Sequence, residues 1–401
     1  MAAAQIHAAK MRNSPEDQAL WKRHASEWRD PAQIASQWKE ASAIDPRMLE
    51  TRSRGQWWEL LERLGVTLFV TREYEHLTLA LSAREGRPRV TFFPVPHPSG
   101  LVVDRTAHRL YLASTRNPNQ VHVLKPTTGL LERTDTKAQA DCGHPFAPVT
   151  STCYPGCLYM HDLALIGGEL YSNAVGHNAV VRLNLEGGFR RVWWPQCIEH
   201  DGKPVFERNH IQLNSIAAGR TPRDSFYSAS SCSLGRLRPG HLSYKVDRQG
   251  VVFSGRTREP VCHGLTRPHS ARLRKGRIWV ANSGYGELGF VTDGRLEVVC
   301  KLPGWTRGLC LIDDIAFVGT SRVIPRFSRY APGLDRISSI CGVHAVHLKN
   351  GSILGSIEWP AGNQVFAMDW ISDRVSPGFL FRAERRRSSQ EIAFFYRYLT
   401  N

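Results

Sequence analysis

One unit recurs along this chain: a small or polar residue, a short apolar run, a turn, and a second apolar run centred on an aromatic residue. Five copies, 38 to 60 residues apart, carry the aromatic residues Tyr111, Tyr171, Tyr227, Trp279 and Phe317. A degenerate sixth copy follows at 365–368. Repeats near the ~40–50 residues of a four-stranded blade are typical of β-propellers. Units of this kind bury both faces only when they pack around a ring.

Three further strand-like runs, at 66–71, 76–81 and 89–93, precede the first copy. We expect them to complete the last blade, which starts near Gln364, and so to close the ring. The sequence therefore predicts an all-β fold, a β-propeller of six blades. Seven blades follow if 66–93 form a blade of their own, and a β-sandwich explains the long repeat poorly.

The first 65 residues differ from the rest, because tryptophans lie in a charged, Ala-rich stretch with few turn residues. We predict a helical or partly ordered N-terminal extension at 1–65 and a propeller at 66–401 that ends in a basic tail. Within the extension, the apolar spacing from Trp57 to Leu64 indicates a short amphipathic helix that Gly65 ends.

Composition limits the partners and the compartment. The net charge is +16, but no recognition-helix or RNA-binding signature accompanies it, which argues against nucleic acid as the partner. The sequence contains no apolar run of about 18 residues, so it predicts no membrane span. Residues 1–12 lack the apolar core of a secretory signal. Nine scattered cysteines, an odd number, indicate free thiols of a reducing compartment. We expect a cytoplasmic protein, and nothing in the sequence indicates its oligomeric state.

The repeats align one polar residue per blade just before the inner strand, where the loops of a propeller meet at the central axis. These residues are Ser99, His161, Asn214, His269, Arg307 and Gln364. Two interpretations stay open. They are inter-blade hydrogen-bonding groups that hold the ring together, or they form a ligand or metal site on the axis.

The metal interpretation uses His161 and His269, from different blades, with His210 as the third ligand; His97 and His177 are further candidates. Imidazole ligands suit zinc, iron or copper. Three histidines with an open position would supply a Lewis acid or a metal-bound hydroxide.

The remaining candidates surround that site. Asp162 adjoins His161 and would orient an imidazole, and Arg307 would clamp a carboxylate or phosphate. Glu287, in a Gly-rich turn with Tyr285, is a candidate general base. We expect Ser99, Asn214, Gln364 and Tyr285 to contact the ligand.

Several motifs resemble a largely bacterial family known as domain of unknown function 4915. They are Met160-His-Asp-Leu-Ala, Arg267-Pro-His-Ser-Ala-Arg, Arg277-Ile-Trp-Val-Ala-Asn-Ser-Gly-Tyr-Gly-Glu-Leu-Gly, Leu302-Pro-Gly-Trp-Thr-Arg-Gly-Leu and Cys341-Gly-Val. The resemblance covers about 57–371 and implies a propeller with a polar axis. It also implies an acidic residue after Gln364, where this chain has Val365.

Two functions of different classes follow. The first is a metal-dependent lyase, hydrolase or oxygenase acting on a small anionic substrate; some propeller lyases and oxygenases hold a metal between axial histidines, an analogy of fold only. The alternative is a non-catalytic propeller that binds a small ligand or a protein partner.

Overall fold

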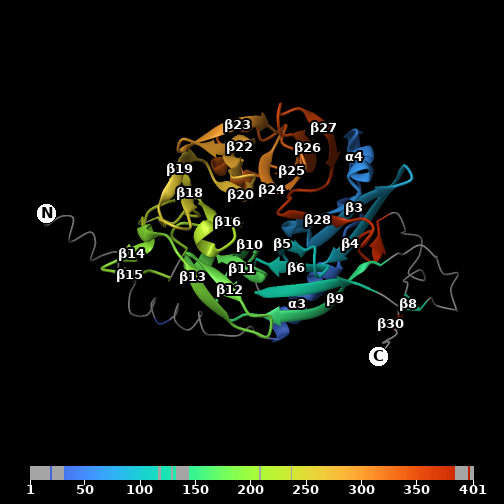
Figure 1. The fold of residues 1–401 in the computed structure, drawn as a ribbon, viewed down its shortest axis with the longest axis horizontal. Coiled ribbons are helices and arrows are strands. Elements are labelled where there is room, and N and C mark those ends of the chain that lie inside the picture. The colour runs from blue at the N-terminus through green and yellow to red at the C-terminus, as the bar shows by residue number, and fades with distance from the viewer. Residues whose placement is uncertain are drawn as a thin grey trace.

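Most strands form six sheets arranged around a common axis (Figure 1) in a computed structural model of the protein. It describes residues 19, 31–115, 119–127, 130–131, 144–206, 209–235, 237–383 and 396–397. The six-bladed propeller is confirmed. The expectations for most of residues 1–30, and for the basic tail beyond 383, lie outside the described residues.

Each blade is an antiparallel meander whose first strand faces the axis. Blade 1 is β5 (Pro98–Asp104), β6 (Arg109–Ser114), β7 (Gln120–Pro126) and β9 (Phe146–Cys153). Blade 2 is β10 (Met160–Ile166), β11 (Glu169–Ala174), β12 (Ala179–Leu183) and β13 (Phe189–Trp193). Blade 3 is β16 (Leu213–Ala217), β17 (Phe226–Ala229), β18 (Gly250–Ser254) and β19 (Pro260–Leu265). Blade 4 is β20 (Pro268–Arg274), β21 (Arg277–Asn282), β22 (Glu287–Thr292) and β23 (Arg295–Lys301).

The last two blades have five strands each. Blade 5 is β24 (Trp305–Ile312), β25 (Ile315–Ser321), β26 (Gly342–His347), β27 (Ile353–Glu358) and β1 (Arg52–Gly55). Blade 6 is β28 (Met368–Ser372), β2 (Val66–Arg72), β3 (Leu77–Arg84), β4 (Arg87–Pro94) and β29 (Phe381–Arg382). Two-stranded pairs join β14 (Glu199–His200) to β15 (Lys203–Pro204) and β8 (Leu130–Leu131) to β30 (Tyr396–Arg397).

Blade 6 closes the ring with strands from both ends of the chain. Its inner strand β28 pairs with β2, from Val66 opposite Ser372 to Val70 opposite Met368. The sixth repeat looks degenerate in sequence because the second strand of its hairpin comes from the other end of the chain. The predicted closure by residues 66–93 is confirmed, so a seventh blade is not formed.

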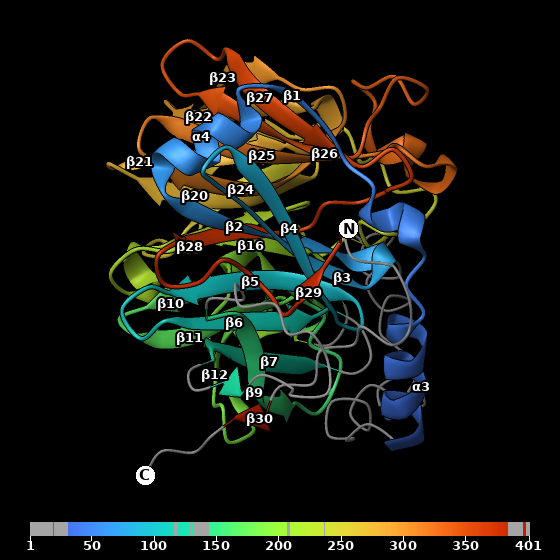
Figure 2. The same ribbon diagram turned by 90° about the vertical axis from the view of Figure 1, so that its right-hand side faces the viewer.

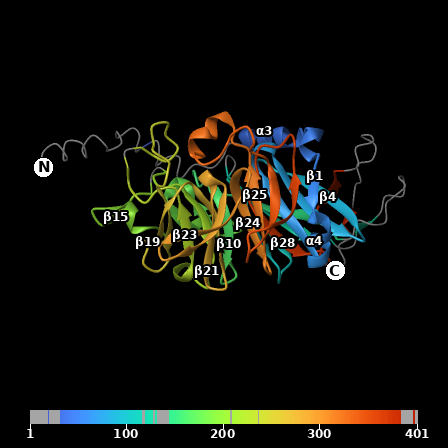
Figure 3. The same cartoon turned by 90° about the horizontal axis from the view of Figure 1, so that it is seen from above.

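Among the described residues, two α-helices accompany the propeller. Helix α3 (Pro31–Ser42) lies along one face, on the same side as the helical turn η7 (Pro325–Tyr330) (Figure 2, Figure 3). Helix α4 (Trp57–Leu64) ends at Gly65, which is left-handed with φ 61°, as predicted. Within the described part of the chain, no helix is long and apolar enough to span a membrane, and the eight cysteines described there are free thiols.

Helix α4 is attached to the core between blades 5 and 6 by one large side chain. Trp57 is fully buried and packs edge-on against Phe317 with ring centroids 5.6 Å apart. We expect Trp57→Ala to lower the free energy of unfolding by about 3–5 kcal/mol, because it leaves a cavity in a closely packed core. Denaturant unfolding measures this. The half-buried neighbour Trp58 is the matched control, and an equal loss in Trp58→Ala would contradict the assignment.

Candidate functional site: the axial cavity

The predicted axial residues lie where the inner strands are irregular. In blade 2, β10 pairs with β11 at Met160 and again at Leu163, with a register shift between them that contains His161. The register shifts of β5, β16 and β24 likewise contain Ser99, Asn214 and Arg307, whereas the shift of β20 follows His269, which pairs with Ala281. A β-bulge bends a strand and re-aims its side chains, so side chains at these positions leave the regular blade and turn either toward the axis or toward the next blade.

A second tier of residues lies in the sequence two positions before four of the axial residues. His97, Tyr159, Gln212 and Arg267 are all left-handed, with φ of 44°, 50°, 48° and 54°, and all four line one cavity. Non-glycine residues adopt this backbone infrequently, and such residues cluster at functional sites. The repeat pattern did not reveal this tier, although its fixed offset from the axial residues is a signal that could have done so.

The cavity has a volume of about 1210 Å³, and its lining includes Gln37 of α3 and Phe327 and Tyr330 of η7. Five of the candidate residues line it: His97, His161, His210, His269 and Arg307. Aromatic side chains from Tyr74, Trp305, Phe327 and Tyr330 form part of its wall. The convergence of His161 and His269 on one cavity, expected from the ring geometry, is therefore present.

Arg307 is the most constrained cation of the site. It is only 5% exposed, and its Cζ lies 3.3 Å from the centroid of the Phe366 ring. Its Nη1 lies 3.1 Å from the side-chain amide of Gln364, whereas Nε and Nη2 have no partner among the described residues. Burial lowers the pKa of Arg307 to about 10, so the guanidinium remains charged at neutral pH.

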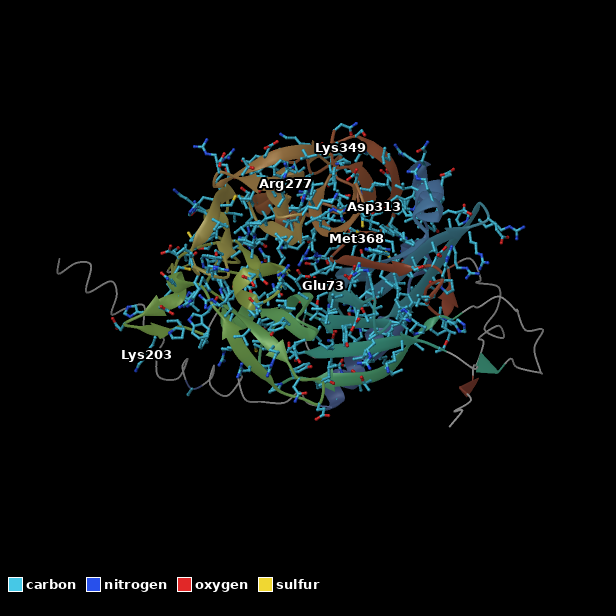
Figure 4. All side chains as sticks on the ribbon, viewed as in Figure 1. Glu73, Lys203, Arg277, Asp313, Lys349 and Met368 are labelled. Carbon is cyan, nitrogen blue, oxygen red and sulfur yellow. The ribbon has the colours of Figure 1, made fainter. Side chains whose placement is uncertain are left out.

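Gln364 connects this cation to an acidic residue that the sequence did not indicate. In the orientation that satisfies both contacts, its amide oxygen accepts from Arg307 and its nitrogen donates to Glu73 Oε2 at 3.2 Å. Glu73 begins the turn η2 (Glu73–Glu75) between β2 and β3, and Figure 4 labels it near the middle of the ring. An acidic group thus lies beside Gln364, although position 365 is a valine.

His269 is held in one tautomer. Its Nδ1 lies 2.7 Å from the carbonyl oxygen of Arg267 and 3.1 Å from Ser283 Oγ. Since the carbonyl only accepts, Nδ1 carries the proton and Nε2 retains its lone pair. Burial, with smaller contributions from Arg307 and His161, lowers the pKa of His269 well below its ordinary value. The ring is therefore neutral, and Nε2 is a hydrogen-bond acceptor.

Other buried histidines make the stability of the fold depend on pH. Burial lowers the pKa of His122 and of His344 to about 4 each, against about 6.5 in an unfolded chain. Between these values the unfolded state binds more protons, so stability is complete above pH 6.5 and falls as the pH decreases. We expect roughly 1–2 kcal/mol to be lost per histidine between pH 7.5 and 5.

Denaturant unfolding at both pH values measures this dependence. His344 bonds Ser356 Oγ at 2.8 Å and Thr320 Oγ1 at 3.0 Å, so His344→Gln keeps a polar group there without a titrating one. We predict a smaller pH dependence in His344→Gln than in the exposed control His108→Gln. Equal dependence in the two variants would show that His344 does not contribute.

The residues predicted to bind a metal do not assemble into a recognisable centre. Within the described ranges, no three His, Cys, Asp or Glu side chains come together so as to hold a metal ion. His210 lies on the cavity wall in a loop whose backbone is fixed by Asn178, which accepts from the His210 amide at 2.8 Å. A zinc, iron or copper ion at this site stays a prediction from the sequence.

Ser99 and Asn214 take part in a ring of inter-blade hydrogen bonds. In each blade a side chain donates to a carbonyl at the inner strand of the next blade. The pairs are Thr71 to Ser99, Ser99 to Met160, Asn173 to Leu213, Asn214 to Pro268, Ser283 to Thr306 and Ser321 to Val365. These contacts match the structural interpretation that the sequence left open for the axial residues, and neither Ser99 nor Asn214 is among the residues lining the cavity.

Asp162 makes a buried ion pair between blades. Its Oδ2 lies 2.7 Å from Arg272 Nη1 and 3.0 Å from the Ile216 amide nitrogen, which donates to it. Its Oδ1 accepts from Arg272 Nη2 at 3.2 Å. With both oxygens engaged in joining blades 2, 3 and 4, the carboxylate has a structural role. We expected Asp162 to orient an imidazole, but none of these contacts is made to a histidine.

Tyr285 and Glu287 lie away from the axis. They line a separate cavity of about 670 Å³ with Arg248 and His263. Glu287 accepts from Asn282 Nδ2 at 2.8 Å, and the Tyr285 hydroxyl lies 3.0 Å from an Asp247 oxygen. Neither residue is among those lining the axial cavity, so the structure does not bring these two candidates together with His161 and His269.

Several solved structures are similar to this chain at low sequence identity. A chain of the nidogen/laminin complex is 7% identical with a TM-score of 0.50, over 76% of this chain and 98% of its own. A protein of unknown function from Bacteroides caccae is 10% identical with a TM-score of 0.49, over 76% and 98%. A gluconolactonase from Xanthomonas campestris is 14% identical with a TM-score of 0.42, over 74% and 86%. No curated protein matches the chain.

The sequence motifs on the inner strands give a more specific relationship than the fold does. The family described as Domain of unknown function (DUF4915) matches residues 55–380, from the last residue of β1 to the residue before β29. The protein therefore belongs to the DUF4915 family, whose resemblance the motifs of blades 2, 4 and 5 had indicated.

Proposed function

We propose that the axial cavity binds a small organic anion and that the protein is an enzyme acting on it. The observation that carries this proposal is the Arg307 side chain. A buried guanidinium with two nitrogen atoms unbonded is costly unless an acceptor pairs with it. Carboxylate and phosphate oxygens match the fork of a guanidinium in geometry and charge.

The surroundings of Arg307 favour an anion that also carries a flat apolar part. The Trp305 ring lies 5.9 Å from Arg307 Cζ and packs edge-on against His269 at 5.5 Å. Phe327 continues this wall, 5.4 Å from Trp305. Aromatic walls with a few fixed polar groups are typical of small-molecule sites.

Two imidazoles next to the cation supply groups that a reaction could use. His161 packs edge-on against Phe366 at 5.5 Å, on the same ring that Arg307 covers. His269 offers the lone pair of Nε2, which can accept a proton from a bound molecule or from water. The lyase, hydrolase or oxygenase expected from the sequence stays part of the proposal at the level of a reaction on a small anion.

Calorimetric titration with benzoate and with its neutral analogue benzamide tests binding. We expect benzoate to bind at one site and benzamide to bind at least about tenfold more weakly, because only the anion pairs with the guanidinium. Equal affinity for the two would contradict the proposal.

Incubation with a small-molecule extract tests catalysis. The wild-type protein and Arg307→Met are incubated separately, and organic anions are quantified by mass spectrometry. An enzyme consumes at least one anion that the variant leaves intact. An anion that is retained by the wild-type protein but never converted would instead identify the non-catalytic binding propeller.

A further inference from the structure

The axial cavity contains a second buried guanidinium. Arg267, from the left-handed tier, is 4% exposed, and its Cζ lies 4.0 Å from the centroid of the Tyr330 ring. Its Nη1 donates to Gln212 Oε1 and lies 3.3 Å from Ser230 Oγ, whereas Nε has no partner among the described residues. Arg267 thus repeats the features of Arg307: a buried cation with an unbonded donor.

Aromatic rings connect the two cations. Trp305, beside Arg307, lies 5.4 Å from Phe327, and Phe327 lies 5.9 Å from Tyr330, on which Arg267 stacks. Arg329 covers the same tyrosine, with Cζ 4.6 Å from its centroid. Successive rings are tilted by 41° and 36° to each other, so the wall between the guanidiniums is aromatic and offers ring faces to an unsaturated ligand, and Arg329 adds positive charge beside Tyr330.

The two charges also act on each other. Positive charge on Arg267 contributes to lowering the pKa of Arg307, after the larger effect of burial. Like charges that share a cavity with restricted access to water repel each other. Glu73, which also lines the cavity, offsets part of the charge on Arg307, and an anionic group of the ligand at each guanidinium would offset the remainder.

We propose that the ligand carries two anionic groups, carboxylate or phosphate, joined by a flat unsaturated body. One group pairs with Arg307 and the other with Arg267, and the body lies against Trp305, Phe327 and Tyr330. This inference rests on the proposed anion site for its first group only. It narrows the substrate class from small organic anions to planar dianions.

Matched ligands test the second group without any change to the protein. Terephthalate and biphenyl-4,4′-dicarboxylate are titrated calorimetrically beside their own monomethyl esters, which keep the body and lose one charge. We expect at least one diacid to bind about tenfold or more tightly than its ester, since a second charge-assisted pair forms. In Arg267→Met that advantage should disappear, whereas Arg182→Met, which removes an exposed arginine of β12, should keep it.

The outcomes separate this inference from the proposed function. If no diacid binds more tightly than its monomethyl ester, although the binding of both depends on Arg307, the second subsite is overturned and the anion site stands. If neither acids nor esters bind better than benzamide, the anion site itself fails. Should Arg267→Met not fold, Arg267→Lys keeps the charge but loses the fork, and it should reduce the advantage of the diacid without abolishing that of benzoate over benzamide.

Discussion

Replacing Arg307 by methionine is expected to weaken the binding of benzoate about 100-fold or more. Methionine fills a similar volume against Phe366 but removes every donor that faces the anion. Losing one partner of a buried, hydrogen-bonded charge pair costs about 2–5 kcal/mol, and about 1.4 kcal/mol corresponds to a tenfold change in affinity. Calorimetry at neutral pH measures the dissociation constant directly.

Two controls make this result specific. Arg182→Met removes an exposed arginine of β12 and should leave the affinity unchanged. Arg307→Lys retains a positive charge without the planar fork and should bind benzoate with intermediate affinity. If Arg307→Met binds benzoate as tightly as Arg182→Met does, the anion is held elsewhere.

The largest predicted loss of stability outside the apolar core comes from Asp162→Ala. The variant leaves Arg272 without its carboxylate partner in a position where the Asp162 side chain is 4% exposed and that of Arg272 is 22% exposed. Removing one member of a buried pair costs about 3–5 kcal/mol, and the partial exposure of Arg272 favours the lower end. Denaturant unfolding at pH 7.5 measures the change.

Asp224→Ala is the matched control, because Asp224 also pairs with an arginine, Arg256, at 3.0 Å but at the surface. Exposed pairs contribute little, so this variant should unfold close to the wild type. At a temperature where Asp162→Ala is fully folded, it should still bind benzoate normally. A stable Asp162→Ala variant that no longer binds benzoate or is inactive would instead support the catalytic role expected for Asp162 from the sequence.

The sequence repeat predicts the ring of blades, and the geometry of that ring predicts which residues lie near its axis. Copies of one supersecondary unit must meet at their inner strands, so aligning the repeats brought His161, His269 and Arg307 to one cavity before any coordinates were known. The same alignment could not distinguish these residues from Ser99 and Asn214. All five lie near the start of an inner strand, and only the direction of each side chain decides whether it faces the cavity or the next blade.

The other parts of the site lie outside the repeated unit. Glu73 belongs to a turn between the second and third strands of blade 6, and Phe327 and Tyr330 belong to an insertion after β25. Neither position has a counterpart that the repeat alignment could compare. Tyr285 and Glu287 follow the first hairpin of blade 4 closely in sequence. They lie at or just before the start of β22, the third strand counted from the axis, and line a separate cavity.

A crystal of the protein with 4-iodobenzoate would test the central claim most directly, because the anomalous signal of iodine locates the molecule. We predict one strong peak in the axial cavity near Trp305, with the carboxylate within hydrogen-bonding distance of Arg307 Nε and Nη2. A peak at any other place, from a compound that binds in solution, would contradict the assignment of the axis as the anion site.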